Sequence, residues 1–74
     1  MNYNYKVTAT SLNGDEVIRE YFEDREEAEK FLDTILADTK DNIINSLPYD
    51  TLRVDFYSFT EGEWAVRSRK LLMK

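Results

Sequence analysis

The side chains of this 74-residue chain offer few groups that could carry out catalysis. Cysteine and histidine are both absent, which removes the thiolate nucleophile, the commonest general base and the strongest metal ligands together. A serine or threonine nucleophile would need an activating lysine, and no spacing in the chain selects such a pair. Asp38 and Asp41 are close in sequence, but they lack the oxygen-rich loop of a calcium site. The sequence therefore predicts a protein that is not an enzyme and has no catalytic residue, metal or cofactor.

Aromatic and basic side chains recur with a period of two in the segments on either side of the centre of the chain. If these segments are strands, alternate residues lie on one face of a sheet. The candidate partner-binding residues on that face are Tyr21, Tyr57, Phe59, Arg19, Arg53 and Arg67, with Lys6 and Arg69 beside them. Tyrosine, phenylalanine and arginine are enriched where proteins contact one another. The face is therefore predicted to bind a protein partner, or a second copy of the chain in a homodimer with no separate ligand.

Two other interpretations of this face stay open. Bases of single-stranded nucleic acid stack on aromatic rings that lie beside cations. The net charge of −5 disfavours phosphate binding, however, and the RNP signature of RNA-binding sheets is absent. Aromatic residues on a surface are also common where nothing binds. We weight the protein contact and the absence of any role equally, and both above nucleic acid.

A second candidate surface is acidic and consists of Glu26, Glu29 and Asp33, with Asp38 and Asp41 further along the same row. A row of carboxylates can imitate nucleic-acid phosphates and occupy the basic groove of an enzyme. The other interpretation, a solvated helix face, is favoured because Lys30 and Lys40 interrupt the row. In size and acidity alone, the chain is similar to inhibitor and accessory proteins of phages and bacteria. We expect a small acidic protein-interaction module, with a phage or bacterial accessory protein or inhibitor as one candidate role.

One helix is predicted to position the acidic residues, within the stretch from Asp24 to Leu47. Asp24 is the expected N-cap, and Glu27 three residues later completes a capping-box pattern. The apolar stripe thins in the second half of the stretch, so the helix either bends or ends near Asp38. The apolar positions that follow the helical spacing are Ala28, Phe31, Leu32, Ile35 and Leu36.

The segment before the helix is predicted to form a β-hairpin. Residues 3–10 alternate in the manner of a strand, and a second strand is expected from about residue 16 to residue 22. Asn13-Gly14 between them indicates a two-residue type I′ turn. Because a carboxylate on the apolar face is tolerated best at an exposed edge, Glu20 places the second strand at the edge of the sheet. The turn sets Thr10 opposite Val17, Ala9 opposite Ile18, Val7 opposite Glu20 and Tyr5 opposite Phe22.

Residues 51–73 are predicted to form a second hairpin. A two-residue turn at Glu61-Gly62 is disfavoured because it sets Arg67 and Arg69 against apolar residues. We expect instead a three-residue loop that includes Thr60, with the glycine in the left-handed position of a bulge. This register aligns Leu52, Val54 and Phe56 with Trp64 and Val66 on the core face, and it sets Asp55 opposite Arg67.

These segments predict an α+β fold with the order ββαββ. A four-stranded, mostly antiparallel sheet of two hairpins has one long helix packed on one face, and residues 1–74 form a single domain. The pairing at the centre of the sheet stays open, since the first strand can pair antiparallel with the third or parallel with the fourth. The expected core residues are Tyr5, Val7, Ala9, Ile18, Phe22, Ala28, Phe31, Leu32, Ile35, Leu36, Leu52, Val54, Phe56, Trp64 and Val66.

The sequence also bears on location. No apolar run approaches the roughly 18 residues that a membrane span needs. The first residues lack the basic and apolar regions of a signal peptide, and the absence of cysteine favours a reducing compartment. We therefore expect a cytoplasmic protein that does not engage a membrane. Its 74 residues leave a marginal core, which a homodimer would help to stabilise.

Overall fold

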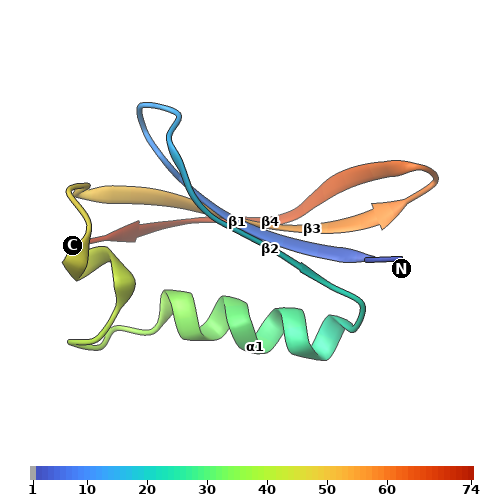
Figure 1. Cartoon of the computed structure of the whole chain (residues 1–74), viewed down its shortest axis with the longest axis horizontal. Helices are drawn as coiled ribbons and strands as arrows, with labels where there is room; N and C mark the ends of the chain where they lie inside the picture. The colour runs from blue at the N-terminus through green and yellow to red at the C-terminus, as the bar shows by residue number, and fades with distance from the viewer. Residues whose placement is uncertain (1) are drawn as a thin grey trace.

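The chain forms one four-stranded antiparallel sheet with a helix on one face (Figure 1). This computed structural model describes residues 2–74. The elements in chain order are β1 (Tyr5–Ser11), β2 (Glu16–Phe22), α1 (Arg25–Leu36), the 3₁₀ helix η1 (Ile43–Ser46), β3 (Thr51–Thr60) and β4 (Glu63–Met73). The α+β fold with the order ββαββ is confirmed. The order across the sheet is β2-β1-β3-β4, so the first strand pairs antiparallel with the third.

The hydrophobic core lies between the sheet and α1, which packs against β1 and β2 (Figure 1). The helix contributes Ala28 and Ile35, and Ile44 of η1 extends the core past the end of the helix. The buried apolar residues are Val7, Ala9, Ala28, Ile35, Ile44, Leu52, Val54, Phe56 and Leu72. The other expected core residues on this face are half-buried around them, namely Tyr5, Ile18, Phe22, Phe31, Leu32 and Leu36.

The helix α1 begins where the sequence indicates and is shorter than its apolar stretch. Asp24 is the N-cap, and its carboxylate accepts a hydrogen bond from the amide of Glu26 at 3.2 Å. The helix ends at Leu36. Of the two expectations for the second half of the stretch, an end near Asp38 is the one observed.

Asn42 explains why the helix stops there. Its buried side-chain amide donates to the carbonyl oxygens of Ile35 at 2.6 Å and Ala37 at 2.7 Å. Its carbonyl oxygen accepts from the amide of Ile44 at 3.0 Å. One side chain thus satisfies backbone groups at the end of α1 and at the start of η1, where both helices would otherwise leave them unpaired.

The β1–β2 turn differs from the predicted one. Residues 12–14 form a three-residue loop in which Gly14 takes the left-handed conformation at φ 94°. The amide of Ser11 donates to the carbonyl oxygen of Asp15 at 2.8 Å and closes the loop. The predicted type I′ turn is therefore wrong, because the loop has one residue more than that turn allows.

A β-bulge nevertheless restores the predicted register in the body of this hairpin. Thr10 faces Glu16 and not Val17, and the register then shifts by one residue. From Ala9 onward the partners are those predicted, beginning with Ile18. The pairs of Val7 with Glu20 and Tyr5 with Phe22 are also confirmed, and β2 lies at the edge of the sheet as expected.

The β3–β4 turn is the two-residue turn that the sequence disfavoured. Glu61 and Gly62 both have positive φ, at 52° and 80°, which is the type I′ conformation. A register shift then occurs between Phe56 and Tyr57, where Arg67 is the extra residue in β4. The predicted three-residue loop is wrong. The bulge relieves the conflict that argued against the shorter turn, because it moves Arg69 opposite Asp55 and leaves Arg67 unpaired at the edge.

The corrected register moves two expected core residues to the other face of the sheet. Trp64 pairs with Phe59, and Val66 pairs with Tyr57. Val66 is 44% exposed, so its assignment to the core is wrong, as is that of Trp64. Asp55 faces Arg69 and not Arg67.

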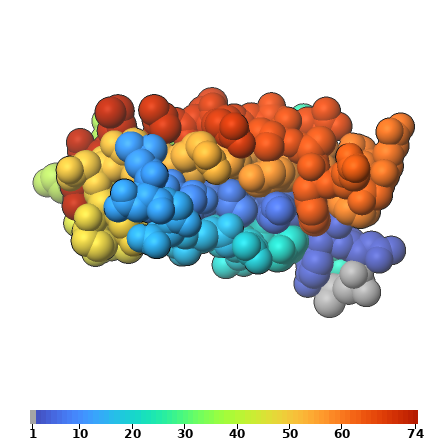
Figure 2. Space-filling model, turned by 90° about the horizontal axis from the view of Figure 1, so that it is seen from above, coloured from blue at the N-terminus to red at the C-terminus, as the bar shows by residue number. Residues whose placement is uncertain are grey.

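We call the side of the sheet away from α1 the open face, since no element of residues 2–74 covers it (Figure 2). It carries Lys6, Thr8, Arg19, Tyr21, Arg53, Asp55, Tyr57, Phe59, Trp64, Val66, Arg69, Leu71 and Met73. The tips of both hairpins curve away from α1, so the open face is concave between them (Figure 1).

Candidate functional site

Aromatic rings pack against one another at one end of the open face. Trp64 of β4 lies close to Phe59 and also reaches Tyr21 of β2, with ring centroids 5.1 Å and 5.9 Å apart. Tyr3 extends the group, since its ring centroid is 5.7 Å from that of Tyr21. We call these four residues the aromatic cluster. Together with Asn2 and Asn4 they line a hollow of about 470 Å³.

The aromatic cluster remains accessible despite this packing. Tyr3 and Tyr21 are each 39% exposed, and Phe59 is 41% exposed. Ring pairs at such centroid distances are worth about 0.5–1.5 kcal/mol beyond the area they bury. The rings therefore stabilise one another and still present apolar surface to a ligand.

Lys6 supports the aromatic cluster from the inner strand β1. Its Nζ lies 4.3 Å from the ring centroid of Tyr57 and 4.8 Å from that of Trp64. Both distances fall within the range of cation–π attraction, which contributes about 0.5–1 kcal/mol at exposed sites. The ammonium group is thus held on the open face and orients the two rings beside it.

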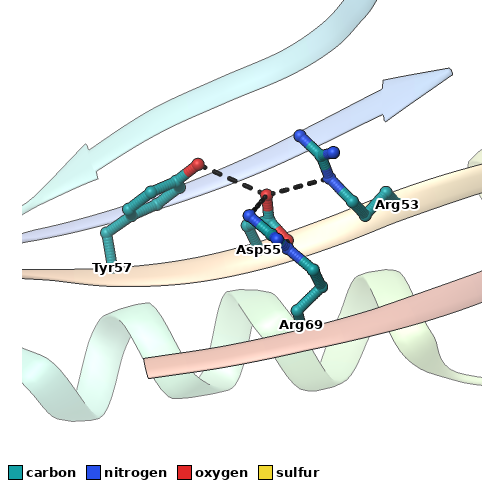
Figure 3. A network of polar contacts seen from close by, with 4 residues as sticks. All are labelled: Arg53, Asp55, Tyr57 and Arg69. Carbon is teal, nitrogen blue, oxygen red and sulfur yellow. Dashed lines mark hydrogen bonds and ion pairs between the residues drawn. The ribbon is translucent and has the colours of Figure 1, made fainter. Parts of the chain in front are cut away.

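The centre of the open face holds a carboxylate with no exposed surface, that of Asp55 (Figure 3). Arg69 Nε donates to its Oδ1 at 2.9 Å, and Arg53 Nε donates to its Oδ2 at 3.2 Å. The hydroxyl of Tyr57 also donates to Oδ2 at 3.3 Å. These hydrogen bonds balance the cost of burying the charge.

Two guanidinium groups, those of Arg53 and Arg69, share the single carboxylate of Asp55. The hydrogen bond from Arg69 to Asp55 raises the pKa of Arg69, which stays charged at any physiological pH. Arg53 is held by the same carboxylate, and the side chains of Arg53 and Arg69 are 44% and 52% exposed. The centre of the open face is therefore locally positive in a chain whose net charge is −5.

Arg19 lies further across the open face, on the edge strand β2. Its Nε is 2.6 Å from Oε1 of Glu16, and this hydrogen bond raises the pKa of Arg19. Thr8 of β1 lies between Arg19 and Asp55 in the pairing of the strands. The arginines on this face are therefore each tied to a carboxylate while keeping exposed donors.

The structure brings five of the six candidate partner-binding residues onto the open face. They are Arg19, Tyr21, Arg53, Tyr57 and Phe59. Arg67 is the exception, because the two-residue turn puts it on the helix side and the bulge leaves it unpaired there. There its Nε donates to Oγ of Ser58 at 2.6 Å, close to Tyr5 and Phe56.

Trp64 is the main residue of this surface that the sequence pattern predicts to lie in the core. The signal that could have found it is the Glu61-Gly62 turn, because that turn pairs Trp64 with Phe59. Tyr3 was recognised only as part of a strand pattern. Its contact with Tyr21 arises because Asn4 continues the line of β1 beside the end of β2, where its amide donates to the carbonyl oxygen of Phe22 at 3.1 Å.

The candidate acidic surface lies on the other side of the molecule. Glu26, Glu29 and Asp33 are all exposed on α1. Glu29 forms an ion pair with Arg25, with Oε1 and Nε 2.9 Å apart, and this contact raises the pKa of Arg25. One of the three carboxylates is thus already paired within the helix.

No family model matches this chain, and no curated protein or solved structure matches it. Among residues 2–74, no helix combines the length and apolar character needed to cross a membrane. The part of the chain that the structure describes also has no group of three or more acidic side chains placed to hold a metal ion. The geometry of the open face is therefore the main basis for a functional proposal.

Proposed function

We propose that this protein is an interaction module whose open face binds a segment of a protein partner. The observation that carries the proposal is the aromatic cluster, which is exposed on a concave sheet surface beside arginine side chains. Aromatic residues and arginine dominate the binding energy of protein interfaces, where they form a packed centre. A partner segment that fits has an apolar side chain for the cluster and a carboxylate for Arg53 or Arg69.

Protein fits this surface better than nucleic acid does. Affinity for a phosphate backbone comes from cations that release counterions, and it grows with their number. The open face has few cations, and the carboxylates of Asp55 and Glu16 offset part of their charge. The chain as a whole carries a charge of −5, which repels a polyanion.

The proposal is tested by capture from a lysate of the source organism with two matched variants. Phe59→Ser removes an apolar side chain from the aromatic cluster, and Leu12→Ser removes one from the far hairpin tip, where Leu12 is 74% exposed. We expect Phe59→Ser to lose a captured protein that the wild type and Leu12→Ser both retain. Circular dichroism checks that both variants are folded.

Two results would count against the proposal. If Phe59→Ser retains the partner and charge reversal at Glu26, Glu29 and Asp33 releases it, the acidic helix is the binding surface. If the purified protein binds single-stranded DNA or RNA in a salt-sensitive way and Phe59→Ser abolishes this, the ligand of the open face is nucleic acid.

A further inference from the structure

The two edges of the sheet carry opposite charge. β2 is one edge and β4 is the other. Residues 16–23, which include β2, hold three glutamates and one arginine, whereas residues 67–74 at the end of β4 hold four basic residues and no acidic one. An edge strand presents unpaired backbone groups and can accept another strand. Charge complementarity therefore selects β2 of one copy for β4 of another.

The directions of the strands suit this contact. All neighbouring strands in the order β2-β1-β3-β4 are antiparallel, so β2 and β4 run in opposite directions. A second copy placed beside the first in the same orientation brings its β2 antiparallel to β4. The sheet then continues across the two copies, and both helices stay on the same side.

The backbone groups also match. In an antiparallel ladder, the N–H and C=O groups of alternate residues point to opposite neighbours. The carbonyl of Phe22 points inward, where it accepts from Asn4, and the amide of Lys74 points inward to Asp50. The outward groups are therefore those of Arg19 and Tyr21 on β2, and of Arg69, Leu71 and Met73 on β4.

One register between the two strands pairs their outward backbone groups and also sets compatible side chains opposite one another. When Arg69 faces Tyr21 of the other copy, Lys70 faces Glu20, and Leu72 faces Ile18. Leu72 and Ile18 both belong to the helix side of their sheets, so their apolar surfaces continue one core into the next. The opposed ammonium and carboxylate form a favourable cross-strand pair.

We infer that copies of this chain associate edge to edge, with β4 of one copy pairing antiparallel with β2 of the next. Pairing of β4 with another β4 centred near Ser68 sets Arg67 against Arg69, and pairing of β2 with another β2 centred on Glu20 opposes the two glutamates. Like charges in such positions destabilise a sheet. Because the contact joins two different edges, each added copy presents a new edge unless the assembly closes into a ring.

Light scattering coupled to size exclusion tests this inference on the full chain at low salt. The concentration is raised to about 1 mM, where a dimer held by a binding free energy of only roughly −4 kcal/mol is substantially populated. The exposed residues Glu20 and Lys70 allow a charge swap that leaves the core intact. We expect the wild type to exceed the monomer mass, and Glu20→Lys and Lys70→Glu each to be monomeric. Glu29→Lys, with the same charge change on α1, is the matched control and should associate like the wild type.

Mixing the two monomeric variants is the decisive step. The new carboxylate of Lys70→Glu then faces the new ammonium of Glu20→Lys, and the other edges keep the native pair, so we expect association to return. A wild type that stays monomeric at about 1 mM would overturn the inference. So would association that survives in both variants, or variants that remain monomeric after mixing.

Discussion

Asp55 is a buried carboxylate on a sheet face that is otherwise open to solvent. Two arginines and a tyrosine hydroxyl satisfy it, and none of the described buried side chains lacks a hydrogen-bond partner. The network fixes Arg53 and Arg69 in position before a ligand arrives. A ligand carboxylate would therefore meet ordered donors, which lowers the entropy cost of binding.

Replacing Asp55 should destabilise the fold. Asp55→Asn removes the charge while keeping the shape, and hydrogen bonds to charged groups contribute about 1.5–3 kcal/mol. We expect a loss of about 1.5 kcal/mol, at the low end, because both guanidinium groups remain close to half exposed. Urea unfolding measures it. Asp33→Asn, on the exposed side of α1, is the control, and an equal loss in both variants would contradict the role of the network.

Tyr49 provides a pH-dependent contact. Its hydroxyl donates to Asp15 at 3.0 Å, and this hydrogen bond, with partial burial, raises the pKa of Tyr49 above its ordinary value of 10.0. The protonated phenol is the form that the folded state favours. The resulting stability is present in full below about pH 10 and is lost as the pH rises through the raised pKa.

The measurement compares the free energies of unfolding of the wild type and Tyr49→Phe across this range. We expect the wild type to be more stable at about pH 8 and the difference to shrink or reverse above the raised pKa. Asp15→Asn should reduce the pH dependence because it removes the charge that favours the phenol. A difference that stays constant from neutral to alkaline pH would contradict the assignment.

At the scale of elements, Asn42 divides what the hydrophobic pattern presents as one helical stretch. Its amide and carbonyl groups serve α1 and η1 together, and the turn between them lets Ile44 enter the core. The apolar stripe alone predicts only that the helix bends or ends near Asp38. The helix ends because the side chain of Asn42 donates back to the carbonyl oxygens of Ile35 and Ala37. The spacing of apolar residues does not reveal such hydrogen bonds.

Removing this side chain should be costly. Asn42→Ala leaves backbone groups of α1 and η1 unsatisfied in a buried place, and each such group costs about 1–3 kcal/mol. We expect a loss of roughly 2–3 kcal/mol in urea unfolding. Asn45→Ala is the matched control, since that exposed amide donates to Thr39 and Lys40 at 3.3 Å. If the two variants lose the same stability, Asn42 does not have this role.

The two hairpins show how far sequence alone determines a register. Strand positions, the edge placement of β2 and most β1–β2 pairs were predictable, because alternation and burial decide them. Each turn type was predicted for the wrong hairpin: the type I′ turn is at Glu61-Gly62, and the three-residue loop is at residues 12–14. Both errors share a cause, since a glycine after a polar residue suits either turn.

In each hairpin, a β-bulge determined how far the register error extends along the strands. In the first hairpin a bulge cancelled the extra loop residue, so the partners from Ala9 onward are as predicted. In the second, the two-residue turn placed Trp64 on the open face and Arg67 on the helix side, and the bulge at Arg67 then set Arg69 opposite Asp55. A bulge depends on packing across the whole sheet, so the local pattern did not reveal it. The open face was therefore predicted in outline without Trp64, the residue of the aromatic cluster that contacts both Phe59 and Tyr21.

At the scale of the whole molecule, the sheet separates two surfaces of different chemistry. The open face carries aromatic and basic groups, and the exposed side of α1 carries Glu26, Glu29 and Asp33. Because these surfaces point in opposite directions, docking of one copy's helix on another copy's open face would produce an open-ended stack. The edge contact inferred above leaves the outer side of α1 and the centre of the open face free for a partner.

The central claim is that the open face contacts a protein partner. Site-specific ultraviolet crosslinking in cells of the source organism, with a benzoylphenylalanine in place of Phe59 or, as a control, in place of Glu29, tests it most directly. We predict a discrete crosslinked protein from the Phe59 position and none of that mass from the Glu29 position. A specific crosslink from the Glu29 position alone, or a crosslink to nucleic acid from the Phe59 position, would contradict the account.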